Sequence, residues 1–551
     1  MKAYIYFFKY SIIILVFVLL TSSRKSFAQG FSPDVQNRFE TIIDSFQNNP
    51  NNPFIGGMSV AIKVDDLALW QGATGYAARN IDDQNNLLPG GTSFSTDTLS
   101  RIYSVTKTFT AALILELAKR KVFNLDEPII KYLPLLSTAN PGLNTTVTIR
   151  QLLAHESGYS DYTDEQDLQI AVAFSPTHIW TPYEMVSYVH QIAAPGAERK
   201  YSSTNYVLLG AIIEAATGKP VEELFRKGFF NRLSLSSMYF GGRESVGNRG
   251  NLASPHDNIS AFNPIFEATG QPTFPDAYTN ISRFPLDGIV SLAFTGGAIV
   301  SNAADLAEWS NDLYGGKATS KSTIDTMLNS ISSTPDEDGD RLGYGIILSN
   351  KISGKYDFIG HDGNAPGYRA IMFYQPEKKM TIVVLTNFHG ADPYAIAKAL
   401  YAATPSFVCF DNKNIIKLCF KNKTICVPAV AAKEFIKKGA YLGGCGQPVS
   451  QPIASSSNAL KISLAKNNLS VSPNPVTSHS TISFQTEQSG NINLSLYDVN
   501  GKLVATLFNG NAEKGIQRTA IIEAGKLNSG IYICRLQTST GAISQKIILQ
   551  R

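Results

Sequence analysis

Ser104 and Lys107 lie three positions apart, directly before a long apolar run. Residues three apart share one face of a helix, so the Lys107 amine can reach the Ser104 hydroxyl if a helix begins here. A serine hydroxyl is a weak nucleophile at neutral pH, and a desolvated lysine beside it is a suitable activator. Free N–H groups at the helix start would also stabilise an oxyanion. The spacing therefore fits a nucleophile and its base, but it equally fits a serine N-cap followed by a surface lysine.

Two further polar motifs follow at long separations. Tyr201-Ser202-Ser203 stands before the apolar helix pattern Val207–Ala216, and His361-Asp362-Gly363 stands before the strand pattern Ile371–Tyr374. Taken alone, a tyrosine is usually a packing residue, and a histidine before Asp-Gly usually belongs to a turn. The three motifs S-x-x-K, Y-x-x and H-x-G, in this order in one chain, are much rarer than any one of them alone.

With these motifs in this order, the sequence resembles the serine β-lactamase and penicillin-binding protein superfamily, in its class C β-lactamase, D,D-peptidase and esterase branch. The resemblance covers about residues 35–400. It includes the phrases LDEPIIKYLP, TIRQLLAHESGYSDY, FTGGAIVSNAADLAEWSNDLY and LGYGIILS. It implies an α/β (α+β) fold in which helices flank an antiparallel sheet and form a helical subdomain.

The resemblance implies four catalytic residues. Ser104 is the acylated nucleophile, and Lys107 lowers its pKa and helps to move its proton. Tyr201 acts as general base and then as proton donor to the leaving group. His361 occupies the place where many relatives have lysine, and would support Tyr201 and the substrate. The reaction would form an acyl-enzyme that water then hydrolyses.

Three substrate-binding residues are also implied. Gly363 leaves an edge strand without a side chain, so that the substrate backbone can lie along it. The backbone N–H of Asn364, with that of Ser104, would form the oxyanion hole. Ser203 departs from the family, which has asparagine two residues after the tyrosine; serine offers no amide to the substrate. Strong β-lactamase activity is therefore not expected. Asn205 is expected to point elsewhere from its helix start.

The remaining chemistry-bearing features favour simpler interpretations. The resemblance places His155, in LLAHESG, beside the site, so we expect a structural role. No metal-ligand set stands out, and no cofactor is expected. The chain has 551 residues, a formal charge of +4, 44% apolar and 17% charged residues. This balance is globular, and the charge is too small to suggest a nucleic-acid partner.

The N-terminus resembles an export signal at residues 1–28. Lys2 and Lys9 precede the apolar run Ile12–Leu20, which is too short to span a bilayer. In Ser26-Phe27-Ala28, the small residues Ser26 and Ala28 stand at the −3 and −1 positions of a cleavage site. The mature chain is therefore expected to begin at Gln29. The alternative is an N-terminal membrane anchor. No other apolar stretch has transmembrane length, so no stable membrane span is expected.

A hydrolase domain is expected over residues 31–403. Strand patterns occur at both of its ends, at Met58–Lys63 and Ala68–Ala73 and again at Ile371–Tyr374 and Met380–Asn387. Helix-like patterns lie between them. One sheet should therefore gather N-terminal and C-terminal segments.

Residues 404–446 form a cysteine-rich module, followed by a linker at 447–466. The four cysteines of the module, Cys409, Cys419, Cys426 and Cys445, allow up to two disulfides with three possible pairings. A zinc site is the weaker interpretation, because the spacings are wide and no histidine lies among them. Similar modules in surface proteins carry histidines where this chain has Phe420, Phe435 and Lys438, so a disulfide-stapled spacer is expected. Cys534 would be an odd or buried thiol.

Residues 467–551 read as short alternating strands of a small all-β sandwich, with a hairpin turn at Asn500-Gly501. The segment resembles the C-terminal sorting domain of the type IX (Por) secretion system in Ser472–Pro475, LYDVNGK, LNSGIYICRL and Lys546. The resemblance implies Sec export, then passage across the outer membrane by the type IX machinery, with the tail removed or surface-anchored. The alternative is a carbohydrate-binding or adhesion sandwich.

These features together predict a secreted or cell-surface serine hydrolase that acts on a small-molecule or peptide substrate. Amide or ester substrates are expected, as for a D,D-peptidase, a D-amino-acid peptidase or an esterase, with at most weak β-lactamase activity. The alternative is a non-catalytic surface protein that binds peptidoglycan fragments or penicillins. Four intact catalytic residues favour the enzyme.

Overall fold

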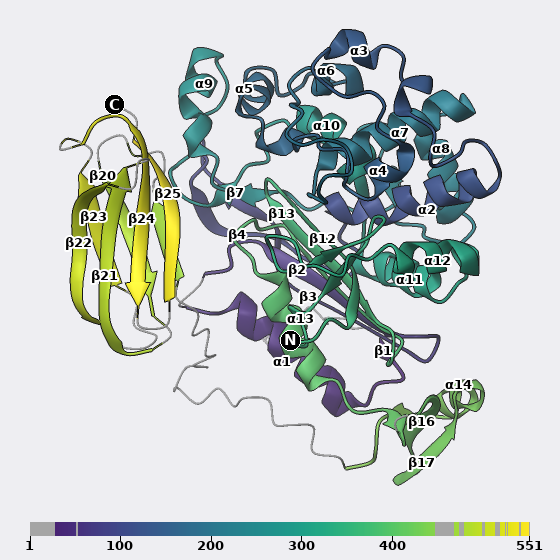
Figure 1. Ribbon diagram of the computed structural model, residues 1–551. Helices are drawn as coiled ribbons and strands as arrows, with labels where there is room; N and C mark the ends of the chain where they lie inside the picture. Colours follow the sequence, from purple (N-terminus) through teal and green to yellow (C-terminus); the bar gives the residue numbers. More distant parts are fainter. Residues whose placement is uncertain are drawn as a thin grey trace, which may run out of the picture. The chain divides into compact units, whose positions relative to one another are not determined.

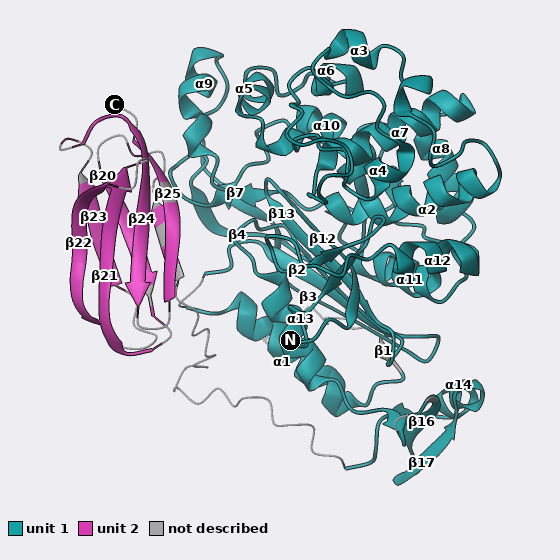
Figure 2. Ribbon diagram, in the orientation of Figure 1, with its two compact units in different colours: residues 1–452 teal, residues 453–551 magenta. Residues whose placement is uncertain are grey.

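The structure is a computed structural model. It describes residues 28–50, 53–410, 412–446, 468–472, 476, 479–486, 488–498, 502–512, 518–523, 525, 527–538 and 541–549. The export signal (apart from Ala28), the linker and the Asn500-Gly501 turn lie outside the described residues. The chain divides into two compact units, residues 1–452 and 453–551 (Figure 2). Each unit is described by itself.

The main sheet of unit 1 has the order β1-β3-β2-β14-β13-β12-β11-β10, with β4 beside β3. All of these pairs are antiparallel. The strands are β1 (Ala28–Gln29), β2 (Gly57–Val64), β3 (Ala68–Ile81), β4 (Leu87–Ser93), β10 (Arg341–Leu342), β11 (Ile347–Ser349), β12 (Phe358–Ala365), β13 (Tyr368–Gln375) and β14 (Met380–Thr386). The expected sheet with segments from both ends of the chain, and both of its strand pairs, are confirmed.

The central strands are buried on both faces. Val60 and Ile62 of β2 belong to one hydrophobic cluster, whereas Ala61 between them belongs to another. Such a strand must be apolar without alternation, as GMSVAIKV is. Two helices, α1 (Pro33–Gln47) and α13 (Pro393–Ala403), pack together over one face (Figure 1). On the other face α11 (Ala303–Tyr314) packs on β2, β13 and β14.

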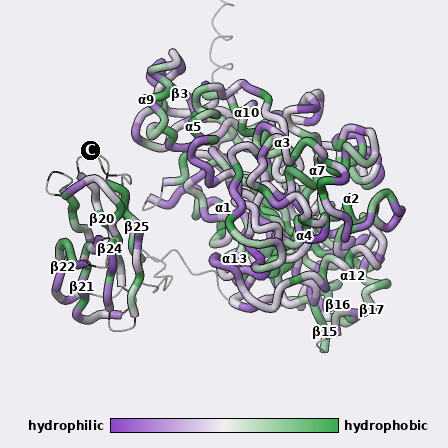
Figure 3. Tube along the Cα trace, turned by 45° about the horizontal axis from the view of Figure 1, so that its top comes forward, coloured by the Kyte–Doolittle hydropathy of each residue, from purple (hydrophilic) through white to green (hydrophobic). Residues whose placement is uncertain are grey.

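The helical part lies beside α11 on the second face (Figure 1). Its helices are α2 (Thr106–Lys119), α3 (Leu136–Ala139), α4 (Ile149–Leu153), α5 (Gln166–Phe174), α6 (Pro182–Val186), α7 (Ser203–Thr217), α8 (Val221–Phe225), α9 (Asn263–Ala268), α10 (Asp287–Gly297) and α12 (Lys321–Asn329). The first ten residues of α2, from Thr106 to Leu115, are all buried. The helices α2, α7 and α10 pack on one another. The mainly hydrophobic course of α7 is visible in Figure 3. An all-round apolar helix needs such a central position.

The cysteine-rich module belongs to unit 1. It contains β15 (Val408–Cys409), β16 (Asn412–Phe420), β17 (Lys423–Pro428), α14 (Ala429–Lys437) and β18 (Tyr441–Leu442). Disulfides join Cys409 to Cys426 and Cys419 to Cys445, so one of the three pairings left open is now assigned. Module residues share a hydrophobic cluster with α1 and α13, and the Leu442 N–H donates to the Gly30 carbonyl at 2.8 Å. The module is thus packed on the hydrolase domain.

Unit 2 consists of two antiparallel sheets, β19-β20-β23 and β22-β21-β24-β25. Their strands are β19 (Asn468–Ser472), β20 (His479–Gln485), β21 (Gly490–Asp498), β22 (Leu503–Ala512), β23 (Arg518–Glu523), β24 (Gly530–Thr538) and β25 (Gly541–Leu549). One hydrophobic cluster, which includes the buried free thiol of Cys534, fills this unit. The expected all-β tail is confirmed. Among the described helices of the chain, none is long and apolar enough to cross a membrane.

Candidate active site

The segment around Ser104 is a tight turn into a buried helix. A single 3₁₀ turn, η1 (Tyr103–Val105), carries Ser104 and leads directly into α2. Ser104 therefore lies in this 3₁₀ turn, just before the α-helix. Tyr103 adopts a left-handed backbone conformation, with φ of 40°. For a non-glycine residue this is strained, and such strain commonly marks functional sites.

Lys107 is fully buried and is hydrogen-bonded at three points. Its Nζ donates to Ser104 Oγ at 2.9 Å, to Ser203 Oγ at 3.3 Å and to the Gly296 carbonyl at 3.0 Å. Burial lowers the pKa of the Lys107 ammonium to about 8, although the Asp161 carboxylate acts in the opposite direction. An amine with this pKa is partly unprotonated near neutral pH and can accept a proton.

Tyr201 and Ser203 enter the site from the start of α7. The Ser203 N–H, which is free at the helix N-terminus, donates to Asp161 Oδ2 at 2.8 Å. Burial raises the pKa of the Tyr201 phenol well above its usual value, while hydrogen bonding to Ser104 and Ser203 acts against that rise. Tyr201 is therefore a neutral phenol in the resting site. Lys107 is better suited than Tyr201 to be the first proton acceptor.

His155 lies directly behind Tyr201. The two rings stack, with centroids 4.7 Å apart and planes 24° from parallel. His155 Nδ1 accepts the Ser202 N–H at 3.1 Å, so the neutral ring carries its proton on Nε2. Burial is the main reason that the pKa of His155 falls well below its usual value. An uncharged, hydrogen-bonded ring at this place holds Tyr201 in position.

The His361-Asp362-Gly363 motif lies inside β12, directly before β13, the strand that contains Ile371–Tyr374. β11 pairs with β12 only as far as Gly360, so the edge from His361 onward is open on that side. A Cβ on Gly363 would lie 2.2 Å from the Ile102 carbonyl oxygen. Besides leaving room for a substrate backbone, glycine is thus required because β12 comes close to the turn that carries Ser104.

His361 itself is buried beside Tyr201, with ring centroids 6.0 Å apart. Its Nδ1 donates to the Asp362 carbonyl at 2.7 Å. In the neutral ring Nε2 is then an acceptor. Among the described residues no hydrogen bond links His361 with Tyr201, so support of Tyr201 by His361 stays a prediction.

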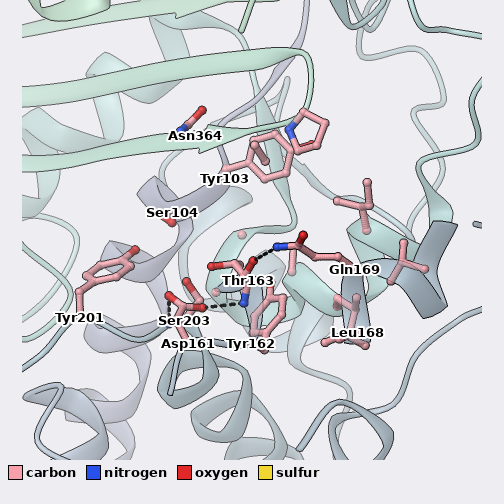
Figure 4. A pocket seen from close by; sticks show the side chains of 18 of the residues that line it. Tyr103, Ser104, Asp161, Tyr162, Thr163, Leu168, Gln169, Tyr201, Ser203 and Asn364 are labelled. Atoms are coloured by element: carbon pink, nitrogen blue, oxygen red, sulfur yellow. Dashed lines mark hydrogen bonds between the residues drawn. The ribbon is translucent and has the colours of Figure 1, made fainter. Parts of the chain in front are cut away.

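A pocket of about 580 Å³ opens at these residues. Ser104, Tyr201, Ser203 and Asn364 all line it, and Figure 4 shows them with Asp161 and Tyr103 around one space. Asn364 is exposed on β12. The structure therefore brings the seven candidate residues together, with Lys107 in contact with Ser104 and His361 beside Tyr201.

Sequence reasoning missed two parts of the site. The Gly296 carbonyl accepts from Lys107, and Asp161 accepts from the Ser203 N–H at the start of α7. Both lie in the phrases FTGG and HESGYSD, which carried the resemblance without an assigned role. His155, expected beside the site in a structural role, stacks on Tyr201. Asn205, by contrast, is buried and accepts from Ser157 Oγ at 2.6 Å, away from the pocket.

The family model named Beta-lactamase matches residues 45–404. This chain belongs to the β-lactamase family. The matched range contains every residue of the candidate site. Residues 470–550 match a second model, the secretion system C-terminal sorting domain. The tail is thus a sorting domain of the type IX (Por) system, which directs export to the cell surface or secretion.

The β-lactamase-family domain is similar to several characterised proteins. Protein flp of Staphylococcus aureus (strain NCTC 8325 / PS 47) is 26% identical over 360 residues, which are 65% of this chain and 64% of that relative. The match thus spans slightly less than two thirds of the relative. Penicillin-binding protein 4* of Bacillus subtilis (strain 168) is 26% identical over 375 residues, 66% of this chain and 74% of that protein.

Solved structures show the same fold. D-amino acid amidase from Ochrobactrum anthropi SV3, complexed with D-phenylalanine, has a TM-score of 0.54 and 23% identity, and the similarity covers 67% of this chain and 98% of the amidase. The domain therefore has the same type of fold, with an antiparallel sheet and helical parts, as expected.

Proposed function

We propose that the protein is an exported serine hydrolase that forms an acyl-enzyme on Ser104 from amide or ester substrates. The observation that carries this proposal is the 2.9 Å hydrogen bond between Ser104 Oγ and a buried lysine whose pKa is about 8. A buried lysine with a lowered pKa beside a pocket-lining serine is an activated pair. A protein that only binds penicillins or peptidoglycan fragments has no need of it.

The chain's own residues suggest the order of proton transfers. Ser104 Oγ attacks the substrate carbonyl, and its proton passes to the Lys107 amine. The Tyr201 phenol, neutral in the resting site, donates to the leaving amine or alcohol and is reprotonated from Lys107. The backbone N–H groups of Ser104 and Asn364 would bind the oxyanion. Water then hydrolyses the ester on Ser104 by the reverse transfers.

The substrate class remains that of D,D-peptidases, D-amino-acid peptidases or esterases. Ser203 supports this choice over a strong β-lactamase. It takes over one task of the family's asparagine, since its Oγ accepts from Lys107. It has no amide to offer to the acylamino group of a penicillin.

Export completes the proposal. A Sec signal peptide over residues 1–28, with the mature chain from Gln29, would deliver the protein to the periplasm. The sorting domain would then engage the type IX secretion machinery.

The test is turnover of p-nitrophenyl butyrate together with labelling by a fluorophosphonate or a fluorescent penicillin. The wild-type protein should hydrolyse the ester and be labelled, and Ser104→Ala should lose both. If neither probe labels the wild type and Ser104→Ala changes no turnover, the protein is a binder and the proposal is wrong.

A further inference from the structure

The backbone breaks inside α10, close to Lys107. Phe294 has φ of 33° and ψ of −127°, which are not helical angles. Glycine adopts such a conformation readily, whereas a phenylalanine in it is strained. The Phe294 ring is buried, and the Arg243 guanidinium lies 4.3 Å from its centroid. Strain that the surrounding packing maintains is commonly part of a functional site, so this break is a candidate for a role in the reaction.

The break is followed by a backbone carbonyl that faces Lys107. Two residues after Phe294, the Gly296 carbonyl accepts from Lys107 Nζ at 3.0 Å. Gly296 and Gly297 have no side chains that could hold this stretch of backbone in place. Anchors on neighbouring residues must therefore fix the position of the Gly296 carbonyl.

Thr295 supplies two such anchors and is completely buried. Its Oγ1 donates to the Tyr206 carbonyl of α7 at 2.6 Å, and its own carbonyl accepts from Thr110 Oγ1 of α2 at 2.7 Å. A Cβ on Gly210 would lie 2.0 Å from Thr295 Oγ1, so α7 needs glycine where Thr295 reaches it. Glycine is unfavourable inside a helix, and this close fit explains its presence in α7. The Thr295 hydroxyl thus holds the residue that directly precedes Gly296.

The Gly296 carbonyl determines how a neutral Lys107 amine is oriented. Such an amine has two N–H donors and one lone pair, and Nζ has three oxygen neighbours: Ser104 Oγ, Ser203 Oγ and the Gly296 carbonyl. A carbonyl can only accept, so one N–H is directed to Gly296. With the other N–H on Ser203, the lone pair faces Ser104 and can take its proton. Without the carbonyl, an N–H is free to donate to Ser104 Oγ, which is the wrong direction for proton transfer.

The carbonyl also acts on the charge of Lys107. Burial lowers the pKa of Lys107 to about 8, and the Asp161 and Asp362 carboxylates act in the opposite direction. Titratable side chains lie around Lys107 on the loops before α7, on α7 and on β12: His155, Asp161, Tyr201, Tyr206, His361 and Asp362. Because an acceptor stabilises the ammonium form, displacing the Gly296 carbonyl should lower the pKa of Lys107 further.

We propose that Thr295 is a positioning residue of the reaction. By anchoring the break in α10 to α2 and α7, its hydroxyl fixes the Gly296 carbonyl, and this carbonyl directs the lone pair of Lys107 to Ser104. Thr295 itself does not line the catalytic pocket, whereas Gly296 does. The inference rests on the proposed hydrolase function and adds to it a residue that acts only through Lys107.

The test replaces Thr295 with valine, which has nearly the same shape but no hydroxyl. With p-nitrophenyl butyrate, Thr295→Val should lower kcat about tenfold or more and change KM less than about twofold. The rise of kcat/KM with pH should move to lower pH by about half a unit, because the Lys107 ammonium loses an acceptor. Thr295→Ser keeps the hydroxyl, so it should recover most of kcat and the wild-type pH profile.

The matched control is Thr404→Val at the end of α13, on the opposite face of the sheet. Thr404 is also buried, and its Oγ1 donates to a helix carbonyl, that of Leu400, at 3.0 Å. This variant should leave kcat and the pH profile unchanged. If Thr295→Val does not fold, Thr110→Val decides instead, because it removes the second anchor and should change kcat and the pH profile in the same directions.

The two proposals fail in different ways. Wild-type kcat in folded Thr295→Val, a loss that Thr295→Ser does not recover, or an unchanged pH profile overturns the positioning role and leaves the hydrolase proposal intact. A wild-type protein that neither hydrolyses the ester nor is labelled at Ser104 overturns the hydrolase proposal itself.

Discussion

At the scale of single residues, the protonation of Lys107 controls the proposed chemistry. Only the neutral amine can accept the Ser104 proton, and burial brings the pKa of Lys107 to about 8. Below pH 8 the ammonium form dominates, so kcat/KM for p-nitrophenyl butyrate, which has no ionisable group, should rise about tenfold from pH 6 to pH 7. It should level off above about pH 9.

The control for this profile is Ser104→Ala, which reports the background hydrolysis at each pH. A wild-type profile that is flat, or that levels off by pH 6.5, would show that Lys107 is not the proton acceptor.

His155 should act through Tyr201. Replacing it with alanine removes the stacked ring and the Ser202 N–H acceptor, and a misplaced catalytic group can cost up to about 100-fold in rate. We expect His155→Ala to lower kcat about 10- to 100-fold with KM changed little. His155→Phe, which keeps the stacking, should recover part of the loss.

The matched control is His190→Ala, since the His190 side chain is exposed and, among the described residues, its ring pairs with Glu165 alone. It should leave kcat unchanged. Equal losses in kcat from the His155 and His190 variants, or a His155 loss that appears only as reduced thermal stability, would exclude a positioning role.

At the scale of elements, the site depends on how closely β12 approaches the nucleophile turn. A methyl group on Gly363 would meet the Ile102 carbonyl at 2.2 Å, and β12 would have to move away. Overpacking of this kind usually costs about 1–3 kcal/mol. Gly363→Ala should reduce kcat/KM about 100-fold or more and lower Tm.

Gly228→Ala is the comparison, because nothing lies within 4 Å of the Cβ it would add. It should keep full activity and leave Tm unchanged or slightly raised. If Gly363→Ala behaves as Gly228→Ala does, the close approach has no role in the reaction.

Much of this element-level structure could be predicted from the sequence. The apolar, non-alternating strands and the order of the three motifs indicate the sheet, the buried helix and the family. The disulfide pairing could not be predicted, because four cysteines allow three pairings and no local pattern chooses among them. The strand around His361 could be expected only from the resemblance, because His-Asp-Gly-Asn is a turn-like sequence whose strand conformation depends on tertiary pairing with β13.

The candidate site shows the same division. Ser104, Lys107 and Tyr201 could be named from motif order, and the structure brings them together. Gly296 and Asp161 could not, because their roles depend on a carbonyl and a carboxylate that face Lys107 and Ser203 only after folding.

At the scale of the whole molecule, the hydrolase and the sorting domain have separate hydrophobic cores. A chain that ends at residue 452 should therefore keep kcat/KM for p-nitrophenyl butyrate within about twofold, because the residues that line the catalytic pocket belong to unit 1. In a bacterium with type IX machinery the same truncation should abolish cell-surface or secreted activity. Loss of hydrolysis by the purified truncated protein would show that the units depend on each other.

The central claim is an acyl-enzyme on Ser104, and it can be observed directly. The enzyme is mixed with excess p-nitrophenyl butyrate, quenched in acid within milliseconds to seconds, and analysed by intact-mass and peptide mass spectrometry. The account predicts a mass increase of one butyryl group on the peptide that contains Ser104, absent from Ser104→Ala and strongly reduced in Lys107→Arg. An adduct that persists in Ser104→Ala, or ester hydrolysis with the nucleophile unmodified at every time, would contradict it.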